Sequence, residues 1–205
     1  KPERDLMTHF GDRLTEANRR TATPLCMGID PHISMIPAIF GSVQDGAASD
    51  AAVSAINDFS MACLEQAIGN VAAIKPQAAF FEQQGPAGMQ ILQNLGRAAI
   101  DAGLLVIMDA KRGDIGSTST AYAAGWIGHD APFPSDALTV NPWLGIDTLA
   151  PFLDRADATG SGLFILNRTS NPGAGDLQDQ MVDGQPLYQH LATLLAPLAP
   201  ARKGK

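Results

Sequence analysis

Five short apolar runs, each followed by sequence with helical spacing of its apolar residues, limit the folds open to this chain. The runs cover residues 25–30, 71–75, 104–108, 137–140 and 162–166. Strands that alternate with helices along a chain are typical of a parallel α/β fold. Polar residues gather at the carboxyl ends of these runs, which favours a TIM (β/α)8 barrel, because its active sites lie on that face. A doubly wound sheet is the alternative, but no GxGxxG follows the first run and no P-loop is present.

The segments between these runs carry the expected helices. Apolar residues at helical spacing predict helices over residues 4–19, 50–68 and 85–102, and small residues after Asp114 predict another. A last helix is expected to start at Pro186, with four leucines on one face. Residues 167–184 are rich in Gly, Asn and Asp and predict a long polar loop. The first run, which ends at Asp30, is expected to be a buried strand.

The third run ends abruptly in alternating charges, LLVIMDAKRGDI over residues 104–115. Side chains two residues apart on a strand point to the same side, so Asp109 and Lys111 should project together. Asp114 follows on the next turn, and we expect both carboxylates to lie close to the ammonium group. Such a cluster keeps a lysine protonated and fixes its direction. The spacing alone is equally compatible with a solvated turn.

Two further charged residues end apolar runs. Lys75 closes a wholly apolar strand, where its charge must be paired or must reach water along the side chain. Asp30 precedes Pro31 and is either a site residue or an ordinary turn aspartate. The two cysteines, Cys26 and Cys63, and the four scattered histidines show no ligand spacing, so no metal site is expected.

Several segments together resemble one enzyme family. DAKRGDI, with LCMGIDPH, IKPQAAFFEQQG, LTVNPWLG and NRTSNPGAGD in the same order, is similar to orotidine 5'-phosphate decarboxylase, in its longer bacterial branch, the type 2 subfamily. The resemblance extends from about residue 25 to residue 195. It implies decarboxylation of orotidine 5'-phosphate to uridine 5'-phosphate (UMP) and CO₂, the last step of UMP biosynthesis, without a cofactor.

The resemblance also implies roles for individual residues. Lys111, held by Asp109 and Asp114, would stabilise the carbanion at C6 of the pyrimidine and deliver its proton. Lys75 would orient Asp109. A second set is expected to bind the substrate, with Asp30 at the ribose hydroxyls, Ser170 at the pyrimidine amide, and Ile115 and Thr118 at the site of a neighbouring subunit. The resemblance also implies that Asp114 faces the neighbouring subunit's site. The substrate-binding set is Asp30, Ile115, Thr118, Asn141 and Ser170.

Composition limits the partners and the location. A net charge of −7 argues against nucleic acid and anionic membranes as partners. No apolar run approaches the length of a membrane span and no signal peptide is evident, so we expect a cytoplasmic protein. The shared site implies a homodimer. Residues 1–205 are expected to form one barrel domain that is incomplete at its C-terminal end, because the family's last strands and phosphate-binding residues are not evident.

Two other functions remain open from the sequence. One is a magnesium-dependent sugar-phosphate aldolase or decarboxylase of the same barrel suprafamily, which shares the Asp-x-Lys-x-x-Asp pattern. The SNPG and KPQAAFFEQ segments, which resemble orotidine 5'-phosphate decarboxylase, argue against this function. The other is a non-catalytic nucleotide-binding relative. The charged residues around Lys111 argue against that function, because a buried charged cluster without a ligand is costly to retain.

Overall fold

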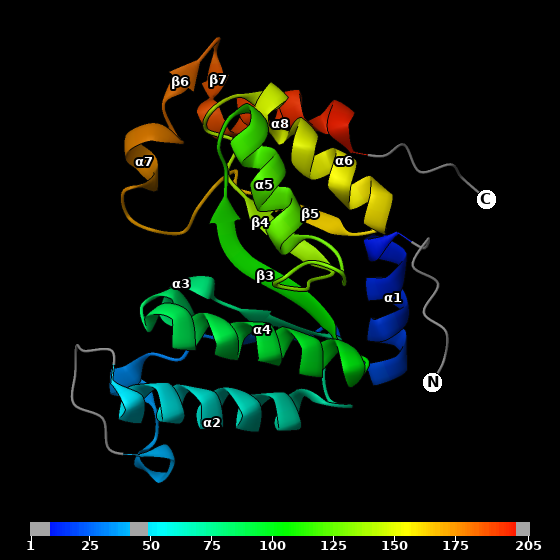
Figure 1. Cartoon of the computed structure of the whole chain (residues 1–205). Coiled ribbons are helices and arrows are strands. Elements are labelled where there is room, and N and C mark those ends of the chain that lie inside the picture. Colours follow the sequence, from blue (N-terminus) through cyan, green and yellow to red (C-terminus); the bar gives the residue numbers. More distant parts are fainter. Residues whose placement is uncertain (1–8, 42–48, 200–205) are drawn as a thin grey trace.

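The computed structural model describes residues 9–41 and 49–199 and contains one parallel sheet flanked by helices (Figure 1). The strands of the sheet are β1 (Cys26–Ile29), β2 (Ala73–Pro76), β3 (Leu105–Arg112), β4 (Ala137–Val140) and β5 (Gly162–Ile165). The helices are α1 (Phe10–Thr21), α2 (Asp50–Ala67), α3 (Ala78–Glu82), α4 (Gly85–Asp101), α5 (Gly116–Trp126), α6 (Ala150–Thr159), α7 (Ala174–Leu177) and α8 (Leu187–Leu195). Shorter elements are the 3₁₀ turns η1 (Ile33–Met35), η2 (Ala38–Phe40), η3 (Ile146–Leu149) and η4 (Ala196–Leu198), and the hairpin β6 (Met181–Val182) with β7 (Gln185–Pro186).

The five strands are neighbours in chain order, and every pair is parallel. Ile74 of β2, for example, lies between Met27 of β1 and Val106 of β3. This sequential order is that of a TIM barrel, whereas a doubly wound sheet reverses its order at a switch point. The predicted parallel α/β class is therefore confirmed, and the doubly wound alternative is wrong. Within the described ranges the sheet is open, with β1 and β5 as its edges.

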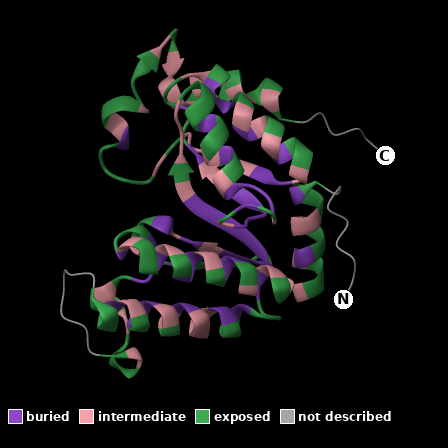
Figure 2. Ribbon diagram, viewed as in Figure 1, coloured by how far each residue is buried: buried purple, intermediate pink, exposed green. Residues whose placement is uncertain are grey.

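Strand alternation divides the buried residues into two layers. Ile74, Val106, Met108 and Leu138 pack on the helices, where α2 and α4 lie side by side on one flank and α5 and α6 on the other. The opposite side chains of the same strands form a smaller cluster that is covered by Phe10 of α1. Figure 2 shows that β3 is the most continuously buried strand. The middle of the sheet is thus supported from both sides.

Some predicted elements differ from the structure. β1 is not a buried strand: only Ile29 is buried, because β1 is an edge without a neighbour on one side. β3 continues through the charged motif to Arg112, and the expected polar loop contains α7 and the hairpin. No residue of α8 is buried, although its leucines share a face. Residues 4–8 of the helix expected over residues 4–19 lie outside the described residues, and α1 forms the rest from Phe10 on.

A buried carboxylate joins α1 to the amino end of the sheet. Asp136, immediately before β4, forms an ion pair with Arg13 of α1. Its side chain also lies 2.8 Å from Nε2 of His129 and accepts a hydrogen bond of 2.8 Å from the backbone N–H of Val106. Burial alone would raise the pKa of Asp136, but His129, Arg13 and the Val106 amide together lower it. These contacts lie at the amino-terminal ends of the strands, the face of a barrel whose residues contribute to stability and not to the active site.

Candidate functional site

A cluster of one carboxylate and two ammonium groups lies at the carboxyl end of the sheet. The carboxylate is Asp109 of β3, which is buried. Its Oδ2 accepts a hydrogen bond of 2.9 Å from Nζ of Lys75, on β2, and its Oδ1 accepts one of 2.6 Å from Nζ of Lys111. The structure therefore brings together three of the four residues expected to be catalytic. Lys75, Asp109 and Lys111 are called the charged cluster below.

The charged cluster has a net positive charge. Burial by itself raises the pKa of Asp109, but hydrogen bonds from Lys111, Lys75 and Thr139 outweigh burial and lower the pKa below 3.8. The carboxylate is therefore ionised at neutral pH. The two lysine side chains remain 36% and 46% exposed, so their ammonium groups can reach a ligand as well as Asp109. A protein with a net charge of −7 thus presents a local site for an anion.

Lys111 has an unusual backbone conformation. Its φ is +47°, in the left-handed region that side chains other than glycine rarely adopt. The pairing of β3 with β4 shifts register between Met108 and Arg112, which releases this residue from the regular ladder. The Lys111 N–H instead donates a hydrogen bond of 2.9 Å to Oγ1 of Thr139, and the Thr139 hydroxyl donates one of 2.9 Å to Oδ1 of Asp109. Thr139 is therefore a part of the site that sequence patterns do not single out.

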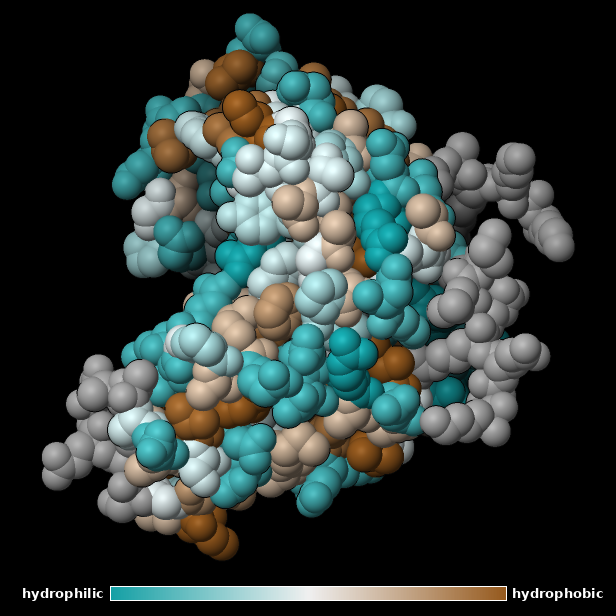
Figure 3. Space-filling view, viewed as in Figure 1, coloured by the Kyte–Doolittle hydropathy of each residue, from teal (hydrophilic) through white to brown (hydrophobic). Residues whose placement is uncertain are grey.

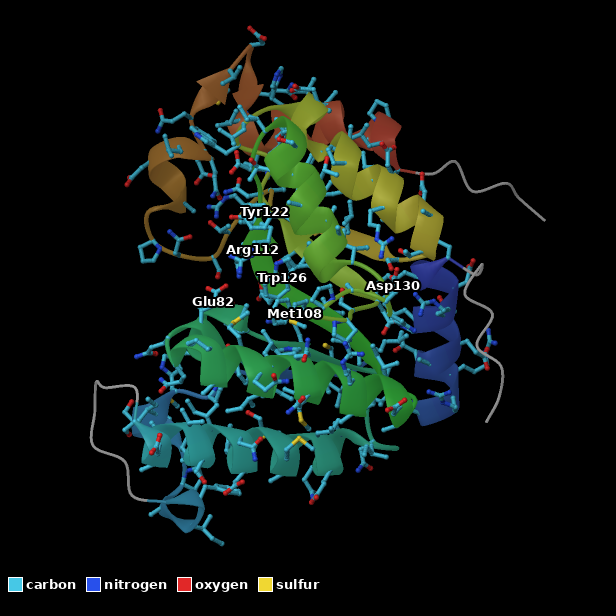
Figure 4. The ribbon with its side chains drawn as sticks, viewed as in Figure 1. Glu82, Met108, Arg112, Tyr122, Trp126 and Asp130 are labelled. Atoms are coloured by element: carbon cyan, nitrogen blue, oxygen red, sulfur yellow. The ribbon has the colours of Figure 1, made fainter. Side chains whose placement is uncertain are left out.

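Arg112 holds the end of β3 between two helices (Figure 4). Its guanidinium forms an ion pair with Glu82 of α3 and lies 4.7 Å from the centre of the Trp126 ring and 5.5 Å from that of Tyr122, both on α5. Its carbonyl accepts a hydrogen bond of 2.8 Å from the N–H of Asn141. Arg112, which directly follows Lys111 in the Asp-x-Lys-x-x-Asp motif, thus fixes the end of β3 that carries Lys111.

Asp114 does not join the charged cluster. Its Oδ1 accepts a hydrogen bond of 2.7 Å from the N–H of Ile115, and among the described residues it forms no ion pair. The expectation that both carboxylates lie against Lys111 is therefore wrong within one chain, and the expectation that Asp114 faces the site of a neighbouring subunit stays a prediction. The left-handed turn at Lys111 directs its side chain back to Asp109, and Asp114 lies beyond that turn. Ile115 is 62% exposed, and Thr118, in the first turn of α5, is also exposed.

The remaining expected site residues follow other strands of the same sheet. Asp30 follows β1, Asn141 follows β4, and Ser170 lies in the segment after β5; all three are exposed. The side-chain oxygen of Asn141 accepts a hydrogen bond of 3.0 Å from the N–H of Trp143. The carboxyl ends of parallel neighbouring strands meet at one edge, so the three residues lie on the side of the sheet that carries the charged cluster. Within the described residues, no hydrogen bond or ion pair joins them to Lys75, Asp109 or Lys111. Figure 3 shows a hollow with hydrophilic residues between the parts that carry α7 and α3.

A mainly apolar pocket of about 380 Å³ lies beside this edge, between the loop after β4 and α8. None of its lining residues belongs to the charged cluster. Asn141 is the one residue of the expected substrate-binding set that lines the pocket. Because the chemistry depends on charged groups, we place the candidate site at the charged cluster and not in this pocket. Representative lining residues are Asn141, Trp143, Leu166, Tyr188 and Leu191.

The described residues offer neither a cluster of metal ligands nor a helix that could cross a membrane. Within residues 9–41 and 49–199, no three His, Cys, Asp or Glu side chains lie close enough together to hold a metal ion. None of the helices in these ranges is both long enough and apolar enough to cross a membrane.

The chain is similar to known decarboxylases. Residues 23–196 match the sequence profile of the orotidine 5'-phosphate decarboxylase / HUMPS family. The orotidine 5'-phosphate decarboxylase of Rhodopirellula baltica is 43% identical over 200 residues, which are 96% of this chain and 66% of that protein. That of Streptomyces coelicolor is 44% identical, over 97% of this chain and 68% of that protein. The chain thus spans about two thirds of the length of these curated relatives.

A solved structure shares the fold. The crystal structure of a putative orotidine 5'-phosphate decarboxylase from Streptomyces avermitilis superimposes with a TM-score of 0.82 at 41% sequence identity. The match covers 99% of this chain and 70% of that one.

Proposed function

Because this chain belongs to the orotidine 5'-phosphate decarboxylase / HUMPS family, we propose that the protein containing it converts orotidine 5'-phosphate to UMP and CO₂. This reaction is the last step of UMP biosynthesis. The observation that supports it most directly is the charged cluster, in which Asp109 accepts hydrogen bonds from Lys75 and Lys111 at 2.9 and 2.6 Å. A carbanion forming beside this cluster would meet a fixed cation that is also a proton donor.

The proposed mechanism places C6 of the pyrimidine next to Nζ of Lys111. Loss of CO₂ leaves an electron pair on C6 that no adjacent carbonyl can delocalise, so its stabilisation must be electrostatic. Lys111 supplies that stabilisation and then transfers one proton to C6. Asp109 would lie near the substrate carboxylate, where repulsion between like charges is relieved as CO₂ departs. Lys75 keeps Asp109 ionised and in position.

We assign the other expected residues to substrate binding at the same edge. Asp30 would accept hydrogen bonds from the ribose hydroxyls, Ser170 would contact the pyrimidine amide, and Asn141 would line the site. Their exposure leaves them accessible to a ligand. We also propose a cytoplasmic location, because the free thiols of Cys26 and Cys63 suit a reducing compartment.

The activity is tested on the full-length protein that contains this chain. Incubated with orotidine 5'-phosphate, it is expected to release CO₂ and UMP in equal amounts, and a metal chelator is expected to leave the rate unchanged. A magnesium-dependent sugar-phosphate enzyme of the same family would instead lose its activity in chelator. A non-catalytic relative would bind UMP in a titration and release no CO₂. Either of the last two results would contradict the proposal.

We further propose a homodimer in which Asp114, Ile115 and Thr118 complete the partner's site. The exposure of Ile115 and Thr118, together with the failure of Asp114 to pair within its own chain, supports this arrangement. Lys111→Ala and Asp114→Ala are each expected to be inactive alone. Refolded together, they should form mixed dimers with one intact site and recover up to about a quarter of the wild-type activity, because half of the randomly paired dimers are mixed.

This recovery has a simple control. Two separate preparations of Lys111→Ala, refolded together, should stay inactive. A mixture of Lys111→Ala and Asp114→Ala that recovers nothing, or a fully active Asp114→Ala, would show that the site is not shared between subunits.

A further inference from the structure

We propose that Thr139 is a positioning residue whose hydroxyl fixes both the backbone at Lys111 and the carboxylate of Asp109. The catalytic part of this inference depends on the proposed decarboxylation. The structural part depends only on the contacts around β3 and β4. Thr139 lies on β4, one strand away from both residues, and is not itself placed to react with the substrate.

The two hydrogen bonds of Thr139 use its hydroxyl in one defined direction. A hydroxyl has a single proton, and Thr139 donates it to Oδ1 of Asp109 at 2.9 Å. The same oxygen accepts the Lys111 N–H at 2.9 Å. Oδ1 of Asp109 in turn accepts the Lys111 ammonium at 2.6 Å. The hydroxyl, the carboxylate and both polar ends of Lys111 therefore form a closed ring of contacts.

The backbone at Lys111 requires such support. A φ of +47° is unfavourable for a residue with a Cβ, and such conformations persist only where the surroundings hold them. The register shift between Met108 and Arg112 interrupts the pairing with β4 at this point. The Thr139 side chain supplies the partner for the Lys111 N–H at this interruption, so the position of the Lys111 ammonium depends on it.

The flanking contacts do not replace this support. Arg112 fixes the next residue through Glu82 and the α5 aromatic rings, and its carbonyl accepts the Asn141 N–H. These contacts hold the strand end as a whole. The direction of the Lys111 side chain is set one residue earlier, where the left-handed turn and the Thr139 hydroxyl meet.

Two substitutions separate the hydroxyl from the shape of the side chain. Thr139→Val keeps the branched shape and removes both hydrogen bonds, whereas Thr139→Ser keeps the hydroxyl and removes a methyl group. In the full-length protein, Thr139→Val is expected to lower kcat about 10- to 100-fold with less than about a threefold change in KM, because misplaced catalytic groups affect mainly the transition state. Thr139→Ser should stay within about threefold of the wild type in kcat.

Thr159→Val is the matched control. The Thr159 hydroxyl, at the end of α6, donates to the carbonyl of Arg155 at 2.9 Å and lies 2.8 Å from Oγ of Ser161. With a third contact of 3.4 Å to the carbonyl of Ala156, this hydroxyl has three polar contacts, all outside the charged cluster, and the variant that loses it should retain wild-type kcat. Equal loss of kcat in Thr139→Val and Thr139→Ser would overturn the inference, because the hydroxyl would then not be the cause.

Amide hydrogen exchange tests the same contacts without any activity. In the wild type and in Thr139→Ser, the Lys111 amide should exchange slowly, because it donates to the hydroxyl. In Thr139→Val it should exchange at least about tenfold faster, while the Leu105 amide on the same strand, which donates to Ala72, stays unchanged. If Lys111 exchanges alike in all three proteins, the inference is wrong. A wild type that lacks decarboxylase activity would overturn the proposed function, and the exchange result would still decide the role of Thr139 in fixing Lys111.

Discussion

Replacing Lys111 by alanine in the full-length protein is expected to lower the rate of decarboxylation by about 10⁴-fold or more. Nζ of Lys111 is 2.6 Å from Oδ1 of Asp109. Burial alone would raise the pKa of Asp109, but the hydrogen bonds from the two lysines and Thr139 lower it. A cation held in this way serves two steps, stabilisation of the carbanion and transfer of the proton. Each kind of contribution commonly accounts for about 10²-fold or more, so losing both removes most of the catalysis.

Binding should survive this change in part. The Lys111→Ala variant retains Lys75 beside Asp109, and calorimetric titration with UMP is expected to show weaker but measurable affinity. Arg19→Ala is a charge-matched control, because Arg19 is an exposed cation on α1 whose partner is Glu16 of the same helix. A Lys111→Ala enzyme that releases CO₂ at near the wild-type rate would contradict the assigned role, as would an equal loss of activity in Arg19→Ala.

The arrangement of the strands followed from local patterns. Each apolar run is short, ends at polar residues and precedes an amphipathic helix, and this pattern is sufficient to predict a parallel sheet. Period-two alternation predicted that Asp109 and Lys111 lie on one side, and they do, although the left-handed turn at Lys111 and not a regular strand directs the lysine to the carboxylate. The pairing of Lys75 with Asp109 followed from the fact that neighbouring parallel strands end at one edge. These features depend on periodicity, which a sequence displays directly.

Other features depend on contacts between distant segments. The left-handed turn at Lys111 is stabilised by Thr139, which is 28 residues further along the chain. The sequence places Asp114 on the turn after the strand, but it does not reveal that the turn already begins at Lys111 and that Asp114 forms no ion pair with Lys111 within the described residues. The exposure of β1 depends on its position at the edge of the sheet, which its apolar sequence does not reveal. Thr139 itself lies in an ordinary strand sequence. Its hydrogen bonds to Asp109 and to the Lys111 N–H become evident only when β3 and β4 are paired in the structure.

Replacing Asp136 by alanine is expected to lower the free energy of unfolding by about 3–5 kcal/mol, because breaking a buried ion pair leaves an uncompensated charge. The Asp136 side chain is fully buried and that of Arg13 is 13% exposed. The Val106 N–H would lose its acceptor as well. Asp130→Ala is the matched control: Asp130 pairs with Arg155, but its side chain is 71% exposed, and such surface pairs contribute about 0–1 kcal/mol. Urea unfolding of the two variants should separate them clearly, and equal losses would contradict the assignment.

The stability that Asp136 contributes should also depend on pH. Its pKa in the folded protein lies below the ordinary value of 3.8, so the folded state favours the ionised form more strongly than the unfolded state does. The contribution is fully present above the unfolded-state pKa and is lost as the pH falls from there through the lowered pKa of the folded state. Asp136→Asn cannot ionise at this position, so its unfolding midpoint should decline less steeply than that of the wild type below about pH 4. Asp109 titrates in the same direction and is present in both proteins, so the difference between the two pH profiles isolates Asp136. Parallel profiles would show that the carboxylate beside Arg13 and His129 is not preferentially ionised in the folded protein.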